Sequence, residues 1–459
     1  MPRVFRDYNV NQPMLFGPDV REWLSDAHPS HFISDVVEKL DLTKIYKSYE
    51  SKGLRGAPPI DPRLLLKIMI YGYSIGTRSS RKLEKATYED VAFRILSCDQ
   101  HPDHDTIAAF RRRHIKSIHG IFLQVLTLCQ EAGLVKMGHV SLDGTKVKAS
   151  ANKSKSRNYE QAEKSQEELN AEIRAALTDA KNTDAAEDKK YGKGRRGDEL
   201  PLRLKNSASR KIIIDQLLAK IEVEATQRCR EYVDEKAEKK KEDDLWMEEN
   251  GEKFERRPPV NPNGKSVAEI VPARRNPTDY DSRIMKEHQS GGHIQGYNCQ
   301  AAVDADSQVI VAAEVTNQVN DKQLAPKMMA EVEKNTGKTP KIMTADNGYF
   351  SERDIVNLEK MGIDPYIPPT SNAIGKRHIN VGQQCRRLTV TAFMREKLNS
   401  KTGGDIYRKR KTITEPVFGQ LKEARRFRTF LLRGTEKVRG EWQLMAICHN
   451  LGKLHKAKA

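Results

Sequence analysis

The chain has 459 residues, enough for two to four domains at roughly 100–200 residues each. Hydrophobic residues make up 37% and charged residues 31%, so part of the chain is expected to form polar, solvated helices. The 80 Lys and Arg against 63 Asp and Glu leave a net charge of +17, which favours a nucleic acid over a membrane surface as partner.

Several classes of protein are excluded by the same composition. The N-terminus has no apolar signal core, and the most apolar stretch, Leu64–Ile75, is interrupted by Lys67 and is too short to span a membrane. The six cysteines are scattered without a CxxC pair, which indicates reduced thiols in a cytoplasm and not a disulfide framework. Cys98 with His101 and His104 lacks a paired partner, so we do not expect zinc there.

Residues 1–138 are predicted to form an all-α N-terminal domain. An apolar helix over Leu64–Tyr73 is entered through a proline-rich segment, Pro58–Pro62, and ends at Gly76. Further helices are expected after Ser79 and near His101–Thr106. Short helices with basic ends are compatible with a helix-turn-helix module, and equally with an ordinary bundle that has a solvated basic face. The candidate DNA contacts in this region are Arg81, Arg111, Arg112 and Arg113.

Residues 139–150 are predicted to form a strand. Alternation places Val140 and Leu142 on one face, and Ser141, Asp143 and Thr145 on the other. Asp is depleted in strands, so Asp143 is expected at a sheet edge, beside a partner, or in a site.

Residues 151–290 differ in composition and are predicted to form a charged helical insertion. The amphipathic pattern over Leu202–Ile221 indicates a helical hairpin or a coiled-coil-like arm, whereas Pro258–Pro277 is expected to be irregular. We interpret this stretch as an insertion into the domain that follows it.

The stretch 291–459 returns to an α/β pattern. A hairpin over 296–304 and 308–315 is followed by a helix (322–334), a strand (341–346), a helix (351–361) and a strand (364–367). The tail from Arg395 is helical and holds 17 Lys and Arg against 6 Asp and Glu, so +11 of the net +17 lies there. The surface expected to bind a polyanion is therefore concentrated in this tail.

Three carboxylates stand out once the insertion is set aside: Asp143 in the first strand, Asp346 at the end of the fourth, and Glu415 in the basic tail. Carboxylates that converge in this way suit two divalent cations, which assist phosphoryl transfer by activating the attacking oxygen and stabilising the leaving oxygen. Because proline is tolerated in a first helical turn, Pro416 predicts that the helix carrying Glu415 begins near Thr414. That helix is expected to present Glu415, Gly419 and Lys422 on one face.

Several segments, in the same order, make the chain resemble a bacterial insertion-sequence transposase of the DDE class. They are Gly56–Pro62, Ser79–Glu84, Pro102–Arg111, Asp281–Arg283 and Gly296–Asp304. The resemblance implies a ribonuclease-H-like mixed sheet interrupted by a helical insertion, with Asp143, Asp346 and Glu415 as catalytic, metal-binding residues. It also implies Mg²⁺ as the cofactor, with Mn²⁺ as a substitute and two ions in the site. Its expected partners are double-stranded DNA, as terminal inverted repeats and target, and further copies of the chain on that DNA, in the nucleoid of a bacterial cytoplasm.

The basic tail departs in one respect from the superfamily signature, in which Tyr, Arg, Glu and Lys follow one another with two, three and six residues between them. Glu415 and Lys422 fit this spacing, whereas Tyr407 and Arg410 lie one residue too far upstream and Lys411 takes the position of the Arg. These residues are candidate DNA contacts, together with a basic and aromatic segment that suits phosphate contacts and stacking: Arg425, Arg426, Arg428 and Arg433. A solvated helix face is the competing explanation.

Each carboxylate also has a structural explanation. Asp143 is able to pair with Lys146, Asp346 precedes a strong Asn347-Gly348 turn, and Glu415 suits a helix start. Asp304 and Asp306 are acidic as well, but they fall at a hairpin turn. Two alternatives to a transposase therefore stay open: a catalytically inactive DNA-binding relative, and a ribonuclease-H-like nuclease without strand transfer.

Overall fold

The structure is a computed structural model, which describes residues 20–50, 59–191, 202–250, 262, 264–287, 291–369, 378–380 and 387–458. The start of the proline-rich motif, Gly56–Pro58, and Cys385 lie outside the described residues. None of the described helices is both long and apolar enough to cross a membrane.

The N-terminal region is helical, as predicted. Its α-helices are α1 (Pro29–Lys39), α2 (Thr43–Glu50), α3 (Pro62–Ser74), α4 (Ser80–Glu89), α5 (Val91–Leu96), α6 (His104–His114) and α7 (Ile118–Glu131). Short 3₁₀ turns lie at Val20–Trp23 and Ile115–Ser117. The described helices around the predicted segments begin and end close to the expected residues.

Local sequence accounts for these helix ends. The Asp61 side chain accepts a hydrogen bond from Arg63 N at the start of α3, and Gly76, with φ +83°, follows its end. The Asp103 side chain caps α6 in the same way by accepting from Thr106 N. Ser79 precedes α4 as predicted, but its side chain makes no capping hydrogen bond.

A mixed sheet follows. Its strands are β1 (His139–Lys148), β2 (Arg283–Lys286), β3 (His293–Asp304), β4 (Ile310–Thr316), β5 (Ile342–Thr344) and β6 (Asp364–Tyr366). β3 lies antiparallel to β1, β2 and β4, whereas β1, β5 and β6 are parallel. The order is β2-β3-β1-β5-β6, and β4 also pairs with β3. This sheet, the insertion after its first strand and the all-α region before it confirm the predicted ribonuclease-H-like α/β fold class.

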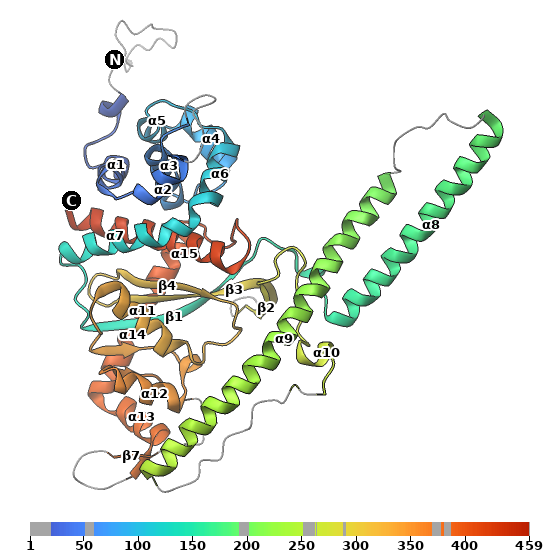
Figure 1. Ribbon diagram of the computed structural model, residues 1–459. Helices are drawn as coiled ribbons and strands as arrows, with labels where there is room; N and C mark the ends of the chain where they lie inside the picture. Colours follow the sequence, from blue (N-terminus) through green and yellow to red (C-terminus); the bar gives the residue numbers. More distant parts are fainter. Residues whose placement is uncertain are drawn as a thin grey trace, which may run out of the picture.

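Helices cover the sheet (Figure 1). They are α11 (Leu324–Thr336), α12 (Glu352–Lys360), α13 (Val390–Asn399), α14 (Lys401–Gly419), a π-helical turn at Gln420–Ala424, and α15 (Thr435–Lys458). Short 3₁₀ turns lie at Lys153–Lys155 and Asn347–Tyr349, and β7 (His378–Asn380) pairs with β8 (Arg387–Thr389).

α15 joins the N-terminal helices to the sheet. It packs against α1, α3 and α7 as well as against β4. Trp442, 1% exposed, donates its indole N–H to the Gln300 carbonyl of β3 at 2.9 Å. The helical region and the sheet consequently share one continuous apolar core.

The insertion leaves the body of the protein as a long helical hairpin (Figure 1). It contains α8 (Tyr159–Tyr191), α9 (Leu202–Asn250) and the short α10 (Val267–Ile270), and has a small apolar core of its own. The predicted hairpin is confirmed. β2 pairs with β3, so residues 283–286 belong to the sheet although the sequence analysis assigned them to the insertion. The domain boundaries themselves stay predictions.

One prediction about the basic tail is wrong. The helix that carries Glu415 begins at Lys401 and not near Thr414, and Pro416 lies inside it. Pro416 has no N–H to donate to the Thr412 carbonyl four residues earlier, and the Gln308 side chain donates to that carbonyl instead, at 2.9 Å. The long-range partner that makes an internal proline acceptable comes from the β3–β4 turn, which the local sequence does not reveal.

Candidate active site

The sheet brings Asp143 and Asp346 together. In the parallel β1–β5 pair, Ser141 is opposite Thr344, and each aspartate follows two residues later, Asp143 in the middle of β1 and Asp346 just past the end of β5. Parallel neighbours lie about 4.8 Å apart, so the two carboxyl groups share one edge of the sheet. Their charges interact, because Asp346 contributes to raising the pKa of Asp143.

Asp143 is held by groups from α14, which packs against β1, β3, β5 and β6. Its Oδ2 accepts a hydrogen bond from Arg410 Nη1 at 3.1 Å and from Thr414 Oγ1 at 3.3 Å. Burial raises the pKa of Asp143 above its usual value, and Asp346 adds to this, whereas Arg410, Thr414 and the Gly144 N–H oppose it. The carboxyl group therefore has a cation beside it and a like charge nearby.

Asp346 also has the structural role that its turn sequence suggests. It precedes the 3₁₀ turn Asn347–Tyr349, and its Oδ1 accepts a hydrogen bond from Gly348 N at 2.9 Å. One carboxylate oxygen is occupied in this way, and the turn fixes the direction of the side chain.

A polar cluster that the sequence analysis missed supports this edge of the sheet. Asp321 accepts hydrogen bonds from Asn298 Nδ2 at 2.6 Å and Gln300 Nε2 at 2.9 Å, and pairs with Lys146 at 3.6 Å. Gln300 also accepts a hydrogen bond from the Tyr349 hydroxyl. Polar residues at alternate positions of a buried strand were the available signal, since Asn298 and Gln300 are 0% and 1% exposed.

Close packing explains Gly144 at this position. A Cβ there would lie 2.5 Å from Gln300 Nε2 and 3.0 Å from the Tyr349 hydroxyl. The residue that follows Asp143 must therefore lack a side chain for β1 and β3 to keep the polar cluster between them.

Glu415 is not beside the two aspartates. It is exposed on α14, and the residue that touches Asp143 is its neighbour Thr414. Within the ranges that the structure describes, no three His, Cys, Asp or Glu side chains are grouped so as to hold a metal ion. The structure thus brings together two of the three predicted carboxylates.

Two of the signature residues of α14 lie in one helical row with Thr414. Tyr407, Arg410 and Thr414 are spaced three and four residues apart, and both Asp143 and Asp346 influence the pKa of Tyr407, which burial raises. Arg410, and not Lys411, contacts Asp143, and Lys411 is exposed. Lys422 lies in the π-helical turn, half-buried, with a pKa lowered by burial.

The other basic candidates differ in exposure. Arg81, Arg112, Arg113, Arg426, Arg428 and Arg433 are exposed. Among these, Arg113 lies over the Tyr49 ring, Arg428 pairs with Glu423, and Arg433 donates to the Ser150 carbonyl at 2.9 Å.

Two candidates are turned inward. Arg111 is 7% exposed and donates to the Arg78 carbonyl at 2.9 Å and to the Tyr73 hydroxyl at 3.4 Å. Arg425 is half-buried against α15, and burial lowers its pKa. In this conformation Arg111 ties the N-terminal helices together and presents no surface to a phosphate.

The aspartate pair fits a divalent cation chemically. Carboxylate oxygens are the ligands that Mg²⁺ prefers, and a bound cation would relieve the repulsion that helps to raise the pKa of Asp143. Glu415 adds nothing to this donor set in the conformation described here.

Comparison with known families matches two regions of the chain. Residues 18–113 match the family model described as "Transposase domain (DUF772)", and residues 268–451 match the one described as "Transposase DDE domain". The second match includes Asp346, Arg410 and Glu415, whereas Asp143 precedes it, on the other side of the insertion. Neither the search of curated proteins nor that of solved structures found a match. With an N-terminal transposase domain followed by a DDE transposase domain, the chain belongs to the insertion-sequence transposase family.

Proposed function

We propose that this protein binds the ends of its own DNA element, cleaves the DNA there and joins the freed end to target DNA in a metal-dependent reaction. The observation that carries the proposal is the pair of aspartates at matching positions of two adjacent parallel strands, Asp143 within β1 and Asp346 just past β5, beside the basic helix α14. Membership of the family supports phosphoryl transfer on DNA, and the aspartate pair supplies the candidate residues for it.

Asp143 and Asp346 would hold the metal. A bound divalent cation supplies a Lewis acid that activates the attacking oxygen and stabilises the leaving oxygen of a phosphodiester. Arg410 favours the ionised form of the Asp143 carboxyl group and fixes its direction through its 3.1 Å contact. Lys422, Arg426 and Arg428 follow on the same segment and are proposed to hold the phosphates of the scissile strand.

Glu415 stays our candidate for the third carboxylate. It neighbours Thr414 on α14 and so lies about 100° around the helix from the residue that touches Asp143. Its participation requires a rotation of this part of α14, and the π-helical turn directly after Gly419 is a place where such an adjustment is feasible.

The test is incubation of a labelled element end and a target plasmid with the protein, with and without Mg²⁺. We expect Asp143→Asn and Asp346→Asn to keep DNA binding and to lose nicking and joining. The control is Asp306→Asn, the same substitution at an exposed hairpin turn, which should retain binding, nicking and joining. Hydrolysis without joining would identify a nuclease, and binding alone an inactive relative. Nicking that survives Asp143→Asn would refute the assignment.

Salt dependence separates electrostatic DNA binding from other contacts. Each phosphate that a basic residue neutralises releases counterions, so the affinity should fall steeply between about 50 and 200 mM salt. A flat response would remove the basic tail from the interface.

A further inference from the structure

α9 has a second apolar face. Its first, around Leu217, Leu218 and Ile221, packs against α8 and α10. The opposite side carries a row of exposed residues, among which Val223 is 66% and Val233 60% exposed. We name this row the α9 stripe: Ile212, Gln216, Ala219, Val223, Thr226, Arg230, Val233 and Ala237.

The spacing of the α9 stripe is that of a coiled coil. Successive members are alternately four and three residues apart, which keeps them on one line along the helix. Five of the eight are aliphatic, although α9 is otherwise rich in charge. Part of the stripe also lines a groove along α9 around Ala219, Val223 and Thr226. An aliphatic line of this length on a charged, exposed helix is the seam through which helices associate.

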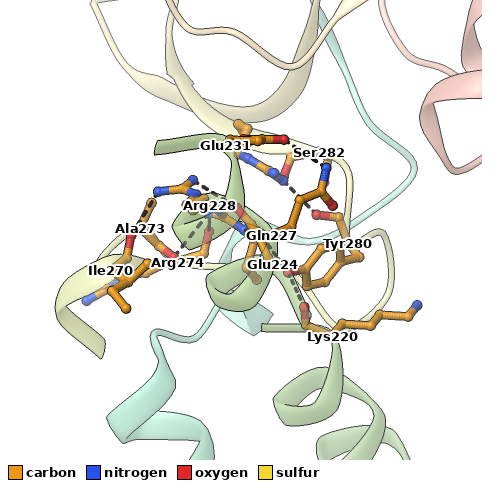
Figure 2. Close-up of polar contacts among 12 residues, drawn as sticks. Lys220, Glu224, Gln227, Arg228, Glu231, Ile270, Ala273, Arg274, Tyr280 and Ser282 are labelled. Atoms are coloured by element: carbon orange, nitrogen blue, oxygen red, sulfur yellow. Dashed lines mark hydrogen bonds and ion pairs between the residues drawn. The ribbon is translucent and has the colours of Figure 1, made fainter. Parts of the chain in front are cut away.

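α9 is anchored near its middle, and its second half has less support. Tyr280 donates to the Lys220 carbonyl at 3.1 Å, and Arg228 donates to the Ile270 carbonyl at 2.9 Å (Figure 2). α8 begins at Tyr159, whose hydroxyl donates to Glu222, so α9 continues well past the base of α8 (Figure 1). A single helix without packing is marginally stable in water, so this second half favours a partner.

The geometry points to a second copy of this chain as that partner, with two α9 helices paired antiparallel through the α9 stripe about a two-fold axis near Arg228. In this alignment Val223 is opposite the partner's Val233, and Thr226 is opposite the partner's Arg230. The first half of each α9, which α8 supports, then covers the second half of the other. In this alignment the stripe faces itself from Ala219 to Ala237, over about 27 Å at 1.5 Å per residue.

The charges beside the stripe select this alignment. Lys220 faces the partner's Asp234, and Glu222 faces the partner's Lys236, and the two-fold axis repeats both pairs. A parallel, in-register pair would instead place Arg230 against the partner's Arg230, which is unfavourable. The flanks of α9 are thus complementary to themselves in the antiparallel direction. The pairing needs neither DNA nor metal and does not rest on the proposed function.

The first test is the oligomeric state of the full chain without DNA or metal, measured by analytical ultracentrifugation over a range of concentrations. We expect a dimer, and we expect Val223→Glu combined with Val233→Glu to raise its dissociation constant at least 100-fold. The matched control is Ile213→Glu, an aliphatic residue of the same helix that is 47% exposed but lies outside the stripe, and it should leave the dimer intact. Circular dichroism checks that each variant keeps its helices.

A charge exchange tests the alignment itself. Glu222→Lys should weaken the dimer about tenfold, because two attractive pairs become repulsive, and adding Lys236→Glu should restore it. The two positions lie 14 residues, or about 21 Å, apart on one helix, so contacts within one chain do not predict this rescue.

Cross-linking gives an independent measurement. The two-fold axis brings Cys229 near the partner's Cys229, so a short bismaleimide should join two chains of a Cys98→Ser, Cys385→Ser variant and fail when Cys229 is also replaced by Ser. A monomer at all concentrations, a dimer that tolerates both Val→Glu changes, or a charge exchange without rescue would overturn the proposal.

Discussion

Glu441 on α15 and Asp143 on β1 are both largely buried carboxylates that face arginine. They differ in how completely hydrogen-bond donors and cations neutralise their charge. The Glu441 side chain is 0% exposed, and its oxygens are surrounded by donors from three separate segments: Tyr73, Arg78, Leu431 and Leu432. Arg111 adds a second cation nearby, which counteracts the rise in the pKa of Glu441 that burial causes. This carboxylate is fully used in joining the N-terminal helices to the segment before α15.

Asp143 differs in both respects. Its side chain is 17% exposed, its ion-pair partner is the single side chain of Arg410, and a second carboxylate, Asp346, lies beside it. A like charge at short range is unfavourable for stability, and it persists where a ligand or a reaction requires it. Burial next to arginine is common to both carboxylates, so it is the incomplete neutralisation of Asp143 that favours a functional role for it over a structural one.

The largest expected effect is the loss of unfolding free energy in Glu441→Gln. Glu441→Gln would leave Arg78 and Arg111 buried without their counter-charge, and we expect the free energy of unfolding to fall by about 3–5 kcal/mol. Asp143→Asn should change it by less than about 1 kcal/mol, because the Asp143 side chain keeps contact with water and the substitution also removes the repulsion from Asp346. Denaturant unfolding of both variants measures the difference, and equal losses would show that the two sites do not differ in kind.

The sequence was sufficient for features that depend on local pattern. The apolar run of α3, the alternation of β1 and the amphipathic segment of α9 predicted elements close to those observed. Asp143 was predicted from its place inside a strand and Asp346 from its place at a strand end, and the parallel pairing of β1 and β5 brings them together. Whether they are catalytic stays a prediction.

Features that depend on partners far away in the sequence could not be predicted from it. Glu441 receives a hydrogen bond from Tyr73, 368 residues away, and no local pattern marks that pair. The helix start predicted near Thr414 is wrong because the Gln308 side chain, which compensates for Pro416 inside the helix, lies 104 residues away from the carbonyl that it reaches. The inward position of Arg111 and the outward position of Glu415 likewise depend on how whole helices pack.

His449 extends the comparison to a buried base, which the protein keeps neutral instead of pairing it with an opposite charge. Burial and the nearby charges of Arg425 and Lys453 lower the pKa of His449 to about 3, although its Nε2–H donates to the Gln308 carbonyl at 2.8 Å. The unfolded chain takes up a proton near pH 6.5 while the folded protein does not, so this stabilisation is complete above that pH and is lost as the pH falls.

We therefore expect a pH-dependent gap in unfolding free energy between the wild-type protein and His449→Gln. Because one pH unit corresponds to about 1.4 kcal/mol, the gap should shrink by about 2 kcal/mol between pH 7 and pH 5. Denaturant titrations at the two pH values measure it. A constant gap would mean that folding does not shift the protonation of His449.

The smallest effect is expected at Arg410 and bears most directly on the comparison. Arg410→Gln removes the cation beside Asp143, but the carboxyl group keeps the Thr414 hydroxyl and the Gly144 N–H as donors and retains some contact with water. It is also free to take up a proton, since its pKa is already raised. The loss in unfolding free energy should therefore stay within about 1 kcal/mol, compared in denaturant titrations with Lys411→Gln, the exposed neighbour, as control. A loss as large as that of Glu441→Gln would show that Arg410 and Asp143 form a structural ion pair, and it would weaken the case that this carboxylate is held ready for a metal ion.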